Sequence, residues 1–75
     1  MDRETIALII AQNGLKTTAT LITAKAVRLR AKAERATDEA AKAKLLSDAD
    51  KASKLATALR IADEGINQYQ IEVSV

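Results

Sequence analysis

The chain contains no cysteine, histidine, proline, phenylalanine or tryptophan, and its aromatic content is a single tyrosine. Without cysteine there is neither a disulfide nor a thiol nucleophile, and without histidine the usual zinc ligand and general base are both missing. No glycine-rich phosphate loop is present, and no acidic pair has convincing metal-ligand spacing among Asp48, Asp50, Asp63 and Glu64. The sequence therefore predicts a protein that is not an enzyme and has no metal or cofactor.

Long apolar runs are also missing. The longest covers residues 6–11, far short of the roughly 20 apolar residues that a membrane-spanning helix needs. The acidic residues Asp2 and Glu4 precede this run, which argues against a signal peptide. We expect a soluble, cytoplasmic protein without a membrane partner.

The hydrophobic residues that are present are small. They make up 48% of the 75 residues, but 16 of them are alanine. A chain this short buries only about 60% of the surface that its unfolded form exposes. A methyl-lined core gains little at about 25 cal/mol per Å² of buried apolar area, so the composition predicts a single domain that forms a homo-oligomer.

Apolar residues recur at every seventh position in two parts of the chain. The first row is Leu8, Leu15, Ile22, Leu29 and Ala36, and it is accompanied by Ala19, Ala26, Ala33 and Ala40. The second row is Leu45, Ala52, Leu59 and Ile66, accompanied by Ala49, Ala56 and Ala62. Alanine at inward positions lets two antiparallel helices approach closely. The expected fold is all-α: an antiparallel, alanine-rich helical hairpin that oligomerises into a helical bundle.

The expected elements are a short helix or helix extension over residues 2–12, a first arm over 15–36 and a second arm over 38–65. Asn13-Gly14 is typical both of a helix C-cap and of a two-residue β-hairpin turn, so a break at this point, a helix with a tolerated glycine, or a strand all fit. The bend is expected at Thr37, which would cap a second helix that begins with Asp38 and Glu39. A bend at Ser47 and one uninterrupted helix are the alternatives. Gly65 predicts the end of the second arm.

The last residues change pattern. Tyr69, Ile71, Val73 and Val75 alternate with polar residues, a period of two that is typical of a strand. A single strand cannot satisfy its own backbone, so we expect residues 69–75 to be either a tail or a short β-strand whose side chains form an interface with another copy, the amino-terminal segment or a protein partner.

Basic side chains gather in the first arm. Residues 1–37 carry seven basic and three acidic side chains, whereas residues 38–75 carry five basic and seven acidic ones. The spacing of three, four and three residues places one row on a single helix face; its members are Lys25, Arg28, Lys32 and Arg35. We call these four residues the basic stripe. It predicts a site for the phosphates of a nucleotide or nucleic-acid ligand.

The alternative is that part of the stripe forms ordinary ion pairs. In a hairpin bent at Thr37, positions whose numbers sum to about 75 lie opposite each other. Lys25 would then face Asp50, and Arg28 would face Asp48. Exposed pairs of this kind contribute about 0–1 kcal/mol.

The chain has two resemblances to known helical hairpins. The second arm, through Lys54-Leu55, Ala58, Ala62 and Ile66, resembles a helix of small phage helical-hairpin proteins that sequester cyclic oligonucleotide immune signals. This resemblance implies an oligomer with anion pockets between hairpins, for which Lys25, Arg28 and Lys32 are the candidates. That family's aromatic residue in this helix and its proline-marked bend are missing.

The second resemblance is to the Rop type of RNA-binding helical hairpin, a dimeric four-helix bundle. It comes from the bend at Thr37-Asp38-Glu39 and the end at Asp63-Glu64-Gly65. It concerns the architecture, and a shared fold does not by itself fix function.

Overall fold

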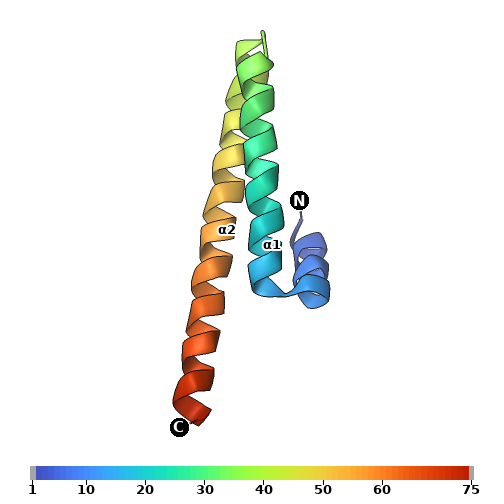
Figure 1. Cartoon of the computed structure of the whole chain (residues 1–75). Coiled ribbons are helices and arrows are strands. Elements are labelled where there is room, and N and C mark those ends of the chain that lie inside the picture. Colours follow the sequence, from blue (N-terminus) through green and yellow to red (C-terminus); the bar gives the residue numbers. More distant parts are fainter. Residues whose placement is uncertain (1, 75) are drawn as a thin grey trace.

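Two long helices form an antiparallel hairpin in the computed structural model of this chain (Figure 1). The structure describes the backbone of residues 2–74 and the side chains of residues 2–68. Helix α1 spans Arg3–Arg35, and α2 spans Glu39–Ser74. The hairpin is slender, with extents of 56 × 19 × 14 Å. The prediction of an all-α helical hairpin is confirmed.

Helix α1 begins with a side-chain cap. The Asp2 carboxylate accepts a hydrogen bond of 2.8 Å from the Thr5 backbone N–H, and Glu4 follows in the first turn. The bond from the Thr5 backbone stabilises the charged carboxylate and so lowers the pKa of Asp2. This cap explains why residues 3–13 start a helix, as expected, even though several of them are β-branched.

Gly14 breaks the first helix. Its backbone takes φ 82° and ψ 169°, a conformation open to glycine because it has no Cβ. The chain turns back here, so that residues 3–13, which we call the N-terminal segment, lie beside the start of the hairpin (Figure 1). The Thr18 hydroxyl donates a 2.7 Å hydrogen bond to the Gly14 carbonyl and is fully buried. Of the alternatives at Asn13-Gly14, the structure has a helix followed by a break.

The bend between the arms lies at residues 36–38, as favoured from the sequence. Ser47, the other candidate, lies inside α2. The capping residue is Asp38 rather than Thr37: its carboxylate accepts a 3.2 Å bond from the Ala41 N–H, and its carbonyl accepts a 2.9 Å bond from the Lys42 N–H. A carboxylate at this position also favours the positive end of the helix.

The core consists mostly of alanine. Its buried hydrophobic residues are Ala19, Ile22, Ala26, Ala33, Ala49, Ala56 and Leu59. Ile10 and Leu15 pack against it from either side of the Gly14 turn. The seven-residue rows therefore predict most of the buried face of the hairpin, but four of their members are exposed: Leu8, Ala40, Ala62 and Ile66.

Helix α2 continues past the predicted end at Gly65 and reaches Ser74. Gly65 does not have a positive φ, so it continues the helix instead of capping it. The expected strand over residues 69–75 is wrong for residues 69–74, because a helix satisfies its backbone hydrogen bonds internally whereas a lone strand needs a partner. The side chains of Tyr69, Ile71 and Val73 are outside the described residues, as is the whole of Val75.

The end of α2 projects beyond the Gly14 turn (Figure 1). We call residues 65–74 the α2 extension. At a rise of 1.5 Å per residue it is about 15 Å long. Neither α1 nor α2 has, over the described residues, the length and apolar content needed to cross a lipid bilayer.

Candidate anion-binding face

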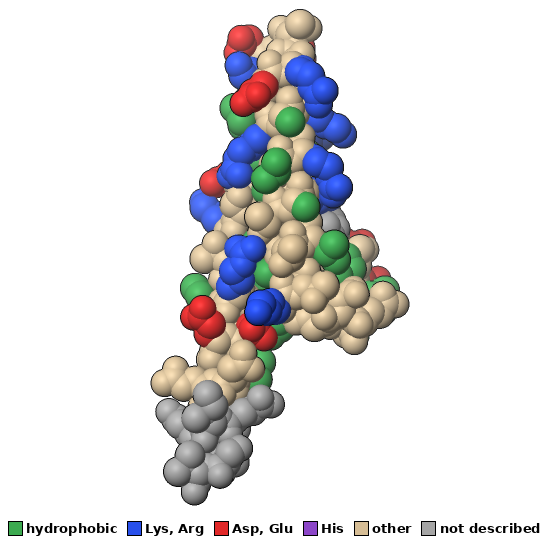
Figure 2. Space-filling view, viewed as in Figure 1, with side chains coloured by type: hydrophobic (Ala, Val, Ile, Leu, Met, Phe, Trp, Pro, Cys, Tyr) green, Lys and Arg blue, Asp and Glu red, His purple; other side chains and the backbone are tan. Residues whose placement is uncertain are grey.

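The basic stripe lies on one side of the half of α1 that follows Gly14. Lys25 is half-buried, whereas Arg28, Lys32 and Arg35 are exposed. Figure 2 shows lysine and arginine side chains along both edges of the hairpin near the bend. The shared face predicted from the spacing is consistent with these exposures, because the buried Ala26 and Ala33 lie on a different face of the helix from the four cations.

The predicted ion pairs between the arms are wrong. Within residues 2–68, the one ion pair is Lys54–Asp50, with an N–O distance of 3.0 Å, and it lies within α2. Asp50 is exposed and pairs with Lys54 one helical turn away, so it does not form the expected pair with Lys25. The four cations of the stripe have no acidic partner within this described part of the chain.

Two other arginines connect the arms by hydrogen bonds to hydroxyl groups. Arg30 donates to Ser53 Oγ at 2.8 Å, and Arg60 donates to Thr23 Oγ1 at 2.9 Å. The sequence did not predict these contacts. Arg30 lies off the basic stripe, and this position could have indicated that it contacts the other arm. These arginines act in hairpin packing, which distinguishes them from the stripe.

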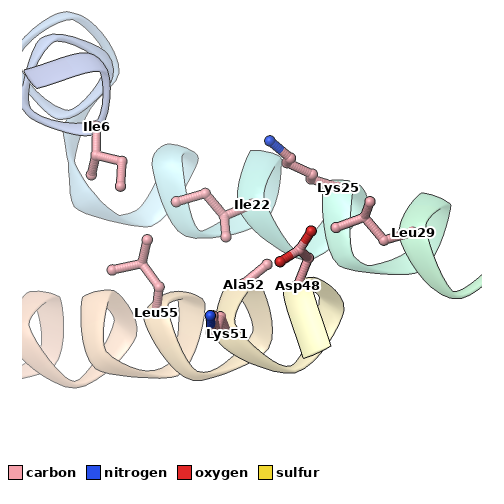
Figure 3. Close-up of a pocket in the computed structure, with 8 residues that line it drawn as sticks. All are labelled: Ile6, Ile22, Lys25, Leu29, Asp48, Lys51, Ala52 and Leu55. Atoms are coloured by element: carbon pink, nitrogen blue, oxygen red, sulfur yellow. The ribbon is translucent and has the colours of Figure 1, made fainter. Parts of the chain in front are cut away.

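A pocket of about 340 Å³ opens where the N-terminal segment stops covering the hairpin. Its floor is apolar, and Figure 3 shows Ile6, Ile22 and Leu55 converging on it from the N-terminal segment, α1 and α2. The remaining lining residues are Lys25, Leu29, Asp48, Lys51 and Ala52. The sequence did not predict this pocket, because it requires the chain to fold back at Gly14 and bring Ile6 to the hairpin.

Basic residues continue from the pocket toward the bend. Lys32 follows Lys25 by seven residues on α1, and Lys44 precedes Lys51 by seven residues on α2. Seven residues are close to two helical turns, so each pair shares a face of its helix. The pocket therefore opens into a strip of surface with lysines from both helices at its edges.

A second hollow, of about 240 Å³, lies near the Gly14 end of the hairpin. Lys16 and Arg60 line it together with Asp63 and Glu64. Two cations and two carboxylates leave it without net charge, so it does not offer an anion the environment that the stripe offers. No group of three residues able to hold a metal ion occurs in the part of the chain whose side chains the structure describes.

Comparison with protein-family models, with curated proteins and with solved structures gives no match to this chain. A functional assignment therefore depends on the residues and the geometry of the chain itself.

Proposed function

We propose that this protein is a non-enzymatic binding protein that holds the phosphates of an oligonucleotide along the basic stripe. The observation that supports this most directly is the row of four cations without an acidic partner among the described residues. From Lys25 to Arg35 the row is about 15 Å long at 1.5 Å per residue. That length suits a ligand with several phosphates better than one with a single phosphate group.

The recognition would be electrostatic. Phosphate contacts from lysine and arginine fix the position of a nucleic acid but carry no base specificity, and their strength falls as salt concentration rises. An aromatic platform that stacks bases is not part of the proposal, because the sequence has only one tyrosine. The proposed ligand is therefore recognised by its backbone, within a self-associating, cytoplasmic protein.

Calorimetric titration against a short linear RNA, a cyclic oligonucleotide and a mononucleotide tests the proposal. We expect affinity to rise with the number of phosphates and to fall with salt. The double variant Arg28→Ala/Arg35→Ala should weaken binding at least tenfold. It should also lower the slope of log affinity against log salt by about two, because each of the two arginines neutralises one phosphate.

The matched control is Lys42→Ala/Lys54→Ala, which removes the same charge from α2. It should reduce affinity much less, because neither lysine belongs to the basic stripe and Lys54 is paired with Asp50. No heat with any of the three ligands, or equal losses in the two variants, would refute the proposed function. Tighter binding of the mononucleotide than of either oligonucleotide would refute the argument from the length of the row.

A further inference from the structure

The apolar spacing of α2 continues beyond the part of the helix that α1 covers. Positions separated alternately by three and four residues run through Leu45, Asp48, Ala52, Leu55 and Leu59, and then through Ala62 and Ile66, and all of them except Asp48 are apolar. Leu59 is 7% exposed, whereas Ile66 is 50% exposed. A spacing of this kind is typical of a helix packed against another helix along its length. In the extension, no other described element of the chain supplies that second helix.

Charge indicates which surface would cover the extension. The extension carries one acidic side chain, Glu72, and no basic one, and Asp63 and Glu64 immediately precede it. Two extensions packed against each other would place like charges together, which is unfavourable. The strip between the pocket and the bend has a net charge of the opposite sign: Lys25 and Lys32 are on one edge, Lys44 and Lys51 are on the other, and one carboxylate, Asp48, lines the pocket.

The dimensions also fit. The strip from residue 25 to residue 35 and the extension from residue 65 to residue 74 are each about 15 Å long. They lie toward opposite ends of a molecule 56 Å long. In a pair of antiparallel copies, the extension of each copy can therefore lie on the strip of the other. This is the closed, isologous arrangement of a two-fold dimer.

We propose that the α2 extension of a second copy covers the apolar pocket floor and the lysine-edged strip of the first, and that the contact is reciprocal. Ile66 of each copy then packs toward the pocket that holds Leu29 and Leu55. At 100° per residue, Arg28 and Arg35 point about 60° away from Lys25 and Lys32. The docked helix therefore covers the two lysines, and in the dimer the two arginines, rather than all four residues of the stripe, stay open to the proposed oligonucleotide. The dimer does not depend on the proposed function.

Molar mass measured by light scattering across a concentration series tests this contact with the full chain. We expect the mass to approach twice 8.0 kDa for the unmodified protein. Ile66→Asp should return it to the monomer while circular dichroism stays helical. Leu46→Asp is the matched control: Leu46 is 46% exposed on the same helix, nearly opposite in direction to Ile66, and its variant should remain dimeric.

Because the chain has no cysteine, single-cysteine variants can locate the contact. A mixture of Ile66→Cys and Leu29→Cys should form a mixed disulfide under mild oxidation. A monomeric mass at all concentrations, equal effects of the two aspartate variants, or preferential cross-linking of Ile66→Cys to itself would overturn the proposal. Retained mass with Arg28→Ala/Arg35→Ala would separate the dimer from oligonucleotide binding.

Discussion

The apolar row Leu45, Ala52, Leu59 and Ile66 runs along α2, but its surroundings change along the helix. In the half that lies along α1, Ala49 and Ala56 are buried at 0% and 1% exposure. In the extension that projects past the Gly14 turn, Ile66 is exposed, and Ala62, shortly before the extension, is exposed as well. The spacing of apolar residues thus identifies the face of a helix that can be covered. The path of the rest of the chain determines how much of that face is covered.

This difference matters because the covered half contributes little area. Its buried side chains are Ala49, Ala56 and Leu59, and the largest side chains of α1 with almost no exposure are Ile22 and Thr18. Close packing of backbones must therefore replace the bulk that leucine pairs supply elsewhere. A core of this kind is sensitive to added volume, and a helix end without such packing is not.

The largest expected effect on stability comes from replacing an alanine with leucine, which we compare at a buried and at an exposed position of α2. Ala56→Leu inserts three carbon atoms into the covered seam and should destabilise the protein by about 1–3 kcal/mol, because the two helices must separate. Ala62→Leu, the matched change at an exposed position of the same helix, should alter stability by less than about 0.5 kcal/mol in dilute protein. Urea unfolding followed by circular dichroism measures both. Equal losses would contradict the distinction between the two positions.

A smaller effect on stability is expected at the two glycines. Gly14 has a positive φ and forms a turn, whereas Gly65 lies within a helix. Gly14→Ala should cost on the order of 1 kcal/mol, because its φ of 82° strains any residue with a Cβ although nothing lies within 4 Å of the new atom. Gly65→Ala should stabilise α2 by about 0.5–1 kcal/mol, since the site is helical and has open space around it. Thermal unfolding distinguishes the two, and a stabilising Gly14→Ala would show that the turn there is not the one described.

The sequence allowed the helical hairpin and its bend to be predicted because both depend on local information. Periodic alanines such as Ala26 and Ala56 mark the buried face, and the acidic pair Asp38-Glu39 marks the start of a helix. The strand expected after Gly65 was wrong for a physical reason: alternation at Tyr69 and Ile71 describes side chains, whereas an unpaired backbone favours a helix that satisfies its own hydrogen bonds.

The candidate site could be predicted only in part. The stripe from Lys25 to Arg35 needs only helical spacing, so the sequence is sufficient to place it on one face. The pocket needs Ile6 to reach Leu55, a contact between residues far apart in the chain that depends on the direction of the turn at Gly14. The expected pairing of Lys25 with Asp50 failed because Asp50 has a nearer partner, Lys54, on its own helix.

Amide hydrogen exchange at several protein concentrations tests most directly whether the α2 extension is covered by a second copy. We predict that amides of residues 65–68 exchange rapidly in dilute protein and become protected as concentration rises, while the amides of Ala56 and Leu59 remain protected throughout. An isolated helix end frays, so protection there requires packing. Rapid exchange of residues 65–68 at every concentration, with the hairpin fully protected, would contradict the proposed dimer.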